Sequence, residues 1–162
     1  MNVKQFRDLI VRPTLAALDL PGGLVAEQLV LGTAAQESRF EDLAQLGGGP
    51  ALGLFQMEPA TFRDLWDRYL ADPGRAELRE RVTRLLAPSP EPVQQLVSNL
   101  RFATAMCRIR YLERPFRLPL QADSAKLAAV WKHWYNTPRG AGRPEEFERN
   151  YQRLVAPAYA TH

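Results

Sequence analysis

The chain has one cysteine and two histidines among its 162 residues, and this scarcity excludes several kinds of site. Cys107 alone cannot form a disulfide within the chain or a cysteine-based metal cluster. His133 lies between two tryptophans on a predicted helix, where a packed or half-exposed ring is the usual case, and His162 is at the terminus. We therefore expect no histidine metal site, no Ser-His triad and no cofactor.

Long apolar runs are also missing. No stretch approaches the roughly 18 consecutive apolar residues that a bilayer-spanning helix needs, and charges interrupt the apolar residues near the N-terminus, so no secretory signal is recognised. We expect synthesis in the cytoplasm, no stable membrane insertion and a monomer. The net charge of +3 permits an acidic partner without requiring one. No concentrated basic helix is present, which argues against a nucleic-acid-binding protein.

Composition and turn signals predict a single all-α domain over residues 1–162, with at most a very short sheet. The apolar fraction of 46% and the charged fraction of 24% are those of a globular protein. Period-two alternation is almost absent, whereas helical spacing recurs between turns. Pro13 is expected to break the first helix in two. The helical segments predicted in this way are 3–19, 24–38, 60–70, 75–86, 93–112, 123–135 and 144–154.

Glu37 is the first candidate for a catalytic residue. It ends a predicted helix whose preceding dozen residues contain only one other charge, Glu27. A carboxyl that an apolar helix carries toward a glycine-rich loop is expected to be partly desolvated, and desolvation raises the carboxyl pKa. A general acid that works near neutral pH needs such a shift. From this pattern alone, a solvated glutamate, or one paired with Arg39, is the commoner case.

Four short segments give Glu37 a context. In chain order they are Glu37-Ser38-Arg39-Phe40, Gly53-Leu54-Phe55-Gln56, Pro59-Ala60-Thr61 and Trp134-Tyr135-Asn136. Together they resemble the lytic transglycosylase family of the goose-type lysozyme superfamily, which typically shows Glu-Ser-x-Phe, Gly-Leu-Met-Gln, Pro-Ala-Thr and Ala-Tyr-Asn in this order. The segment from Asn99 to Leu112 is similar to the family's central helix. The resemblance covers roughly residues 15–142 and implies a lysozyme-like fold.

The resemblance implies an enzyme that cleaves the β-1,4 bond between N-acetylmuramic acid and N-acetylglucosamine in the glycan strands of peptidoglycan. Glu37 would protonate the glycosidic oxygen, and the substrate's own N-acetyl group would stabilise the charge at the anomeric carbon. Glu37 would then act as a base on the 6-hydroxyl of the muramic acid, which closes a 1,6-anhydro ring. Two alternatives stay open, a muramidase that hydrolyses the same bond and a non-catalytic glycan-binding or structural module.

The resemblance carries over to further site residues. Ser38 resembles the serine beside the acid, Gln56 the glutamine that hydrogen-bonds sugar, and Tyr135 the tyrosine beside the anomeric centre. Each has a structural alternative, respectively a serine bonded to its own helix, an amide that braces the loop, and a core aromatic. Asn136 joins this substrate-binding set, although it starts a turn and could instead hold backbone. Glu58 is an auxiliary candidate, because two-carboxylate glycosidases place the second carboxyl ~5–9.5 Å from the first.

The chain departs from the family pattern near the predicted site. The loop Gly47–Pro50 replaces the common Ser-x-x-Gly-Ala, which puts contacts between this loop and substrate in doubt. Trp134 replaces a small residue and could fill core or narrow a sugar subsite. Trp66 and Trp131 could stack on sugar rings, but tryptophans at helical spacing are usually core.

Charged residues outside the motifs allow two readings. Glu41 and Asp42 follow the acid in a probable turn, and we expect them to face water. Five arginines lie between Arg101 and Arg117. They could face the carboxylates of the wall peptides, although a solvated basic face is the more frequent arrangement.

The missing signal sequence bears on where the protein would act. The resemblance suggests a bacteriophage or prophage product, which would reach the wall in the periplasm by holin-type release or on a phage particle. A bacterial enzyme exported by a dedicated secretion machine is the other route.

Overall fold

The structure is a computed structural model, and it describes residues 1–137 and 139–160. Most of this part is helical, which confirms the predicted fold class. Strand pairing in the described residues is limited to two isolated antiparallel bridges that join Leu52 to Ala44 and to Met57. The helical elements are α1 (Val3–Phe6), η1 (Arg7–Val11), α2 (Arg12–Leu18), α3 (Gly23–Glu37), α4 (Pro59–Arg63), η2 (Asp64–Tyr69), η3 (Pro73–Arg75), α5 (Ala76–Thr83), α6 (Gln95–Ser98), α7 (Leu100–Leu112), α8 (Ser124–Val130), η4 (Trp131–Asn136), α9 (Pro144–Asn150), η5 (Tyr151–Val155) and η6 (Ala156–Tyr159).

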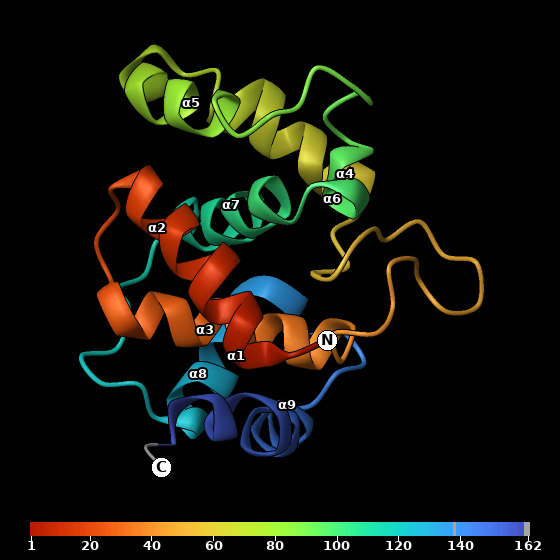
Figure 1. The fold of residues 1–162 in the computed structure, drawn as a ribbon, viewed down its shortest axis with the longest axis vertical. Helices are drawn as coiled ribbons and strands as arrows, with labels where there is room; N and C mark the ends of the chain where they lie inside the picture. Colours follow the sequence, from red (N-terminus) through yellow and green to blue (C-terminus); the bar gives the residue numbers. More distant parts are fainter. Residues whose placement is uncertain (138, 161–162) are drawn as a thin grey trace.

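Helix α3 lies in the middle of the molecule, with α8 and α9 on one side of it and α7, α4 and α5 on the other (Figure 1). Residues 25–35 of this helix are all buried, so it is covered on every face. A small residue is needed where α9 approaches, because a Cβ on Gly32 would overlap the ring of Phe147. On the opposite side, the Thr33 and Tyr111 hydroxyls lie 2.7 Å apart and join α3 to α7. Glu37 is therefore carried at the end of a helix that is buried over most of its length.

The first helical segment does not break at Pro13, contrary to our prediction. The chain stays helical from Val3 to Leu18, and the turn before the proline is a wide π-turn, Arg7–Val11. In that turn the backbone N–H of Arg12 donates to the carbonyl of Arg7, five residues back. The proline then occupies the first turn of α2, where its missing N–H costs little.

The predicted helix over 93–112 is interrupted at Asn99. This residue has an extended backbone (φ −123°, ψ 94°), and its side-chain oxygen accepts a hydrogen bond of 3.0 Å from the Phe102 N–H. Asn99 is thus the N-cap of α7 rather than part of a longer helix. Its amide nitrogen donates to the carbonyl of Leu85 at 2.8 Å, which ties the start of α7 to the segment after α5.

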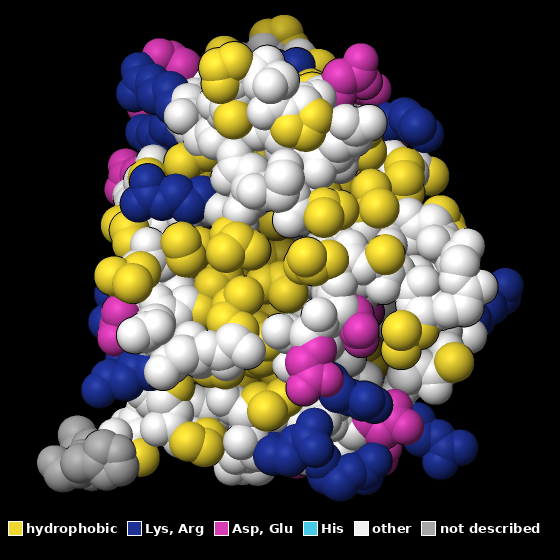
Figure 2. All heavy atoms as spheres, turned by 45° about the vertical axis from the view of Figure 1, so that its right-hand side comes forward, with side chains coloured by type: hydrophobic (Ala, Val, Ile, Leu, Met, Phe, Trp, Pro, Cys, Tyr) yellow, Lys and Arg dark blue, Asp and Glu magenta, His cyan; other side chains and the backbone are white. Residues whose placement is uncertain are grey.

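The surface is uneven in character. Figure 2 shows one face with apolar side chains around a central hollow and Lys and Arg side chains gathered along its lower edge. Large apolar side chains that are exposed in the structure include Leu9, Leu43 and Leu46. Within residues 1–137 and 139–160, no helix combines the length and apolar character that crossing a membrane requires.

Candidate active site

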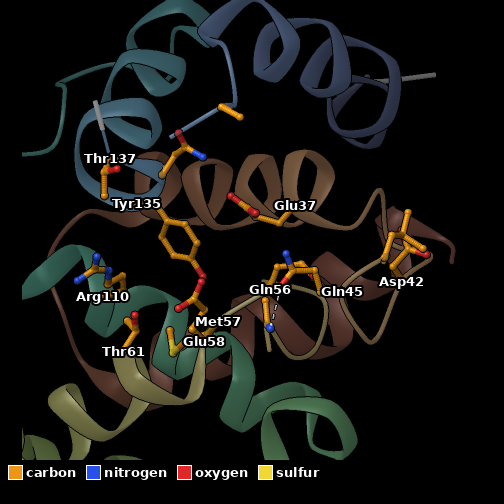
Figure 3. Close-up of a pocket in the computed structure, with 14 residues that line it drawn as sticks. Glu37, Asp42, Gln45, Gln56, Met57, Glu58, Thr61, Arg110, Tyr135 and Thr137 are labelled. Carbon is orange, nitrogen blue, oxygen red and sulfur yellow. Dashed lines mark hydrogen bonds between the residues drawn. The ribbon is translucent and has the colours of Figure 1, made fainter. Parts of the chain in front are cut away.

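A polar cleft of about 720 Å³ opens beside the C-terminal end of α3. Its lining combines the end of α3, the loop that follows, the first turn of α4, α7, and residues 135–137 and 141. The side chains that matter most for chemistry are Glu37, Gln45, Gln56, Glu58, Arg110 and Tyr135 (Figure 3). Segments distant in sequence thus meet at one concave, mostly polar surface, the usual form of a ligand site.

Glu37 has a strongly altered acidity in this cleft. Burial raises its pKa from 4.5 to about 7, because ionisation in a poorly solvated place is costly. One contact opposes this effect. The Trp131 indole N–H donates to Glu37 Oε1 at 2.8 Å and favours the ionised form. A carboxyl that exchanges its proton near neutral pH can serve as both acid and base.

The chain positions Glu37 by ending α3 abruptly. Ser38 caps the helix with a non-helical backbone, and Arg39 and Phe40 both adopt left-handed conformations, with φ of 53° and 60°. Such angles are uncommon for residues other than glycine, so they need packing to hold them. The Phe40 ring provides this packing. It is buried in the main core, the cluster of apolar side chains around α3, where its centroid lies 5.9 Å from that of Phe6.

Gln56 reaches the cleft through a tight turn that depends on Gly53. The glycine has φ of 72°, and a Cβ there would overlap the backbone carbonyl of Leu96. The Gln56 N–H and its side-chain Nε2 both donate to the Gly53 carbonyl at 3.0 Å. The side-chain Oε1 of Gln56 accepts no hydrogen bond from the described residues. Gln56 therefore braces the loop and still offers an acceptor at the cleft.

Tyr135 and Asn136 both line the cleft, as the motif predicted. The Tyr135 hydroxyl donates to the Phe55 carbonyl at 2.8 Å, which ties η4 to the loop that carries Gln56. Asn136 Oδ1 accepts from Lys132 Nζ at 3.0 Å. Both side chains thus hold structure and also line the cleft.

Two further carboxylates line the same cleft. Glu58 is exposed, and Figure 3 shows it near the hydroxyl end of Tyr135. Asp42 lines the end of the cleft remote from Tyr135. Glu41 is exposed and does not line the cleft, as expected. In the part of the chain that the structure describes, no three His, Cys, Asp or Glu side chains are grouped as metal ligands.

Other predicted residues lie elsewhere. Ser38 does not line the cleft, because its hydroxyl is buried and is used by the backbone of the helix end. It donates to the Ala34 carbonyl at 3.1 Å and accepts from the Phe40 N–H at 3.2 Å. Direct contact with substrate is thus not available to Ser38 in this structure, and it supports Glu37 through the backbone. Trp134 packs on Phe116, with centroids 5.4 Å apart, and does not narrow the cleft.

The remaining candidates also stand apart from the cleft. Trp66 packs on Phe62, with ring centroids 5.9 Å apart. Both belong to a second core, the cluster of apolar side chains that includes Leu65, Phe102 and Met106. His133 is exposed and lies against Trp134 rather than in the cleft. His162 lies outside the described residues.

The five arginines do not form one basic face. Arg108 is buried and donates to the Pro21 carbonyl at 2.9 Å, whereas Arg101 and Arg117 are exposed. Arg110 lines the cleft. The expectation of a solvated basic face is therefore corrected, because the packing of α7 buries Arg108 and most of Arg110, while Arg114 and Arg117 lie beyond the end of this helix.

Sequence reasoning missed two contributors to the site, namely the contact of Trp131 with Glu37 and the side chain of Gln45. A signal existed for Trp131, since residues four apart on a helix share a face and it precedes Tyr135 by four. The Gln45 side chain packs against the altered loop. It lies where a Cβ on Gly49 would be, and its Oε1 accepts from the Ala51 N–H at 3.1 Å. Arg110 was one of five arginines considered as a group, and nothing in the local sequence set it apart from the other four.

Replacing Trp131 with phenylalanine tests the link between the indole and the acid. The change removes a donor that favours ionised Glu37, so the pKa of Glu37 should rise above about 7. We expect the titration of the Glu37 carboxyl to move to higher pH in Trp131→Phe. The measurement is the pH profile of the Glu37 carboxyl signal by NMR.

Trp66→Phe is the matched control for this change. It removes an indole of the same size from the second core, where no carboxyl of the cleft is in contact. An unchanged pH profile in Trp131→Phe, or the same displacement in Trp66→Phe, would contradict a specific effect of the indole on Glu37.

A scan of known protein-family models, a search of curated proteins and a search of solved structures each gave no match to this chain.

Proposed function

We propose that this protein is a peptidoglycan-cleaving enzyme with a lysozyme-like fold, acting as a lytic transglycosylase with Glu37 as its acid and base. The observation that carries the proposal is a partly buried carboxyl with a pKa of about 7 at the wall of a polar cleft. Gln56, Tyr135 and Asn136, three of the four substrate-binding residues that the motifs suggested, line the same cleft. An open polar cleft also suits a chain of sugars, which presents hydroxyl and acetamido groups along its length.

The reaction can be followed on the residues of the cleft. Protonated Glu37 gives its proton to the glycosidic oxygen as the bond to the anomeric carbon breaks. The acetamido oxygen of the substrate stabilises the positive charge at that carbon. Ionised Glu37 then takes the proton of the 6-hydroxyl, whose oxygen bonds to the anomeric carbon. No water is consumed, and Glu37 returns to its protonated state. The Trp131 N–H steadies Glu37 during the interval in which it is ionised.

A muramidase is the second candidate, because Glu58 and Asp42 also line the cleft. Either carboxylate could orient a water that attacks the anomeric carbon in place of the 6-hydroxyl. Under this alternative, Glu58→Gln or Asp42→Asn should lower activity strongly. In the transglycosylase, neither carboxylate has a chemical step to perform.

Mass spectrometry of the fragments released from purified peptidoglycan decides between these functions. We expect fragments that end in 1,6-anhydromuramic acid. Each is lighter than the corresponding hydrolysed fragment by the mass of one water, because no water is added. Reducing ends would identify the muramidase. No release of fragments from walls of several chemotypes would contradict both, and would favour a glycan-binding module that does no chemistry.

The same proposal covers the setting in which the protein acts. As a phage or prophage product, or as a substrate of a dedicated secretion machine, it would meet the glycan strands in the periplasm. Clearing of wall suspensions by protein added from outside measures the activity without depending on the route of delivery.

A further inference from the structure

Arg110 is a charged side chain in the cleft that the catalytic proposal does not use. Only 13% of its side chain is exposed. Burial lowers the pKa of its guanidinium, which shows that the charge is poorly solvated. It makes no hydrogen bond to any described residue, although a guanidinium carries five N–H donors. Buried charges are normally paired, because an unpaired one is costly.

The nearest carboxylate cannot satisfy Arg110. Glu113 Oε2 lies 4.0 Å from Arg110 Nη1, too far for a hydrogen bond. Both oxygens of Glu113 also have closer cationic neighbours, with Arg68 Nη2 3.0 Å from Oε1 and Arg114 Nε 3.2 Å from Oε2. Asp64 is held by Arg68, at 2.7 Å. Three arginines thus share two carboxylates, which leaves a local excess of positive charge.

The position of Arg110 in the cleft defines what this charge could bind. Figure 3 shows Tyr135 between Arg110 and Glu37, so the guanidinium lies beyond the tyrosine from the acid. Thr61 and Thr137 line the same end of the cleft and can supply neutral hydrogen bonds. The opposite end carries Asp42. Arg110 is therefore the cation of one end of the cleft, with the exposed Glu58 nearer to the Tyr135 hydroxyl and Asp42 at the far end.

We infer that Arg110 forms a carboxylate-binding subsite of the cleft and selects glycans that carry an acidic substituent near the bond to be cleaved. This inference rests on the proposed function, in which such carboxylates are supplied by the peptide on the muramic acid, or by the lactyl group where no peptide is attached. Arginine suits the role because its planar fork can hold both oxygens of a carboxylate. A neutral polymer of N-acetylglucosamine has the same linkage and acetamido groups but gives Arg110 no partner.

The test compares two variants on two matched ligands. Arg110→Gln removes the charge, and Arg101→Gln is the control, since Arg101 is exposed on the same helix and does not line the cleft. The ligands are a soluble muropeptide oligomer and the same oligomer with its carboxyl groups converted to amides. On the acidic oligomer, we expect Arg110→Gln to lose about 10- to 100-fold in kcat/KM, mostly through KM. On the amidated oligomer, the kcat/KM of Arg110→Gln should equal that of the wild type. Arg101→Gln should have the kcat/KM of the wild type on both oligomers.

Binding on a Glu37→Gln background separates the subsite from the chemistry. The acidic oligomer should bind more tightly than the amidated one, and Arg110→Gln should abolish this difference. Such a result would support the subsite even if the wild type cleaved nothing. Arg110→Lys should restore part of that preference, because it keeps the charge but not the planar fork. The inference is overturned if acidic and amidated oligomers bind alike, if neither binds, or if Arg110→Gln leaves the preference intact.

Discussion

Glu37→Gln should abolish the release of fragments from peptidoglycan and leave the fold unchanged. General acid–base catalysis by one positioned group contributes about 100- to 10,000-fold. We expect a loss at the upper end of that range, because the proposed mechanism uses Glu37 twice. The amide should fit the site, since its oxygen can accept the Trp131 N–H as the carboxyl does. The measurement is the initial rate of fragment release, with circular dichroism to confirm the fold.

Glu41→Gln provides the matched control for this experiment. Glu41 lies four residues farther along the chain, is exposed and does not line the cleft, so its replacement should leave the rate unchanged. A Glu37→Gln protein that folds and keeps wild-type activity would rule out Glu37 as the acid. Loss of activity in both variants would point to damage to the loop rather than to missing chemistry.

The fold could be predicted where the local sequence determines it. The dozen residues before Glu37 contain one other charge, which predicted an apolar helix, and α3 is covered on all sides with Gly32 against Phe147. A helix was predicted from residue 123, and Asp123 caps α8 there, since its side chain accepts from the Ala125 and Lys126 N–H groups. These features depend on residues a few positions apart, which a pattern along the chain records.

The features that could not be predicted from the sequence depend on contacts between distant segments. The break at Asn99 is stabilised by Leu85, and the partner of Glu37 is Trp131, 94 positions away. A tryptophan at helical spacing predicts core, and Trp131 is core, but its N–H has a function that burial alone does not reveal. The motif around Glu37 likewise could not show that Ser38 is buried and faces away from the cleft.

The raised pKa of Glu37 also predicts how the stability of the protein depends on pH. Folding favours the protonated carboxyl, so this residue costs stability as pH rises from 4.5, its ordinary value, to about 7, its value in the fold. Each pH unit in that window is worth about 1.4 kcal/mol, so the full cost is about 3 kcal/mol and is complete above neutral pH. Glu37→Gln carries no such cost. It should therefore be more stable than the wild type by up to about 3 kcal/mol at pH 8–9, with the difference disappearing near pH 4.

Urea unfolding of both proteins across this pH range measures the difference directly, because the titration of every other group is common to the two. Glu58→Gln is the control, since Glu58 is exposed and its replacement should give no such pH-dependent gain. A stability difference between Glu37→Gln and the wild type that does not change with pH would mean that Glu37 is not held with a raised pKa. A difference that grows through the window would show that the folded protein favours the protonated carboxyl and loses stability when this carboxyl ionises. The protonated carboxyl is the state from which the proposed reaction starts.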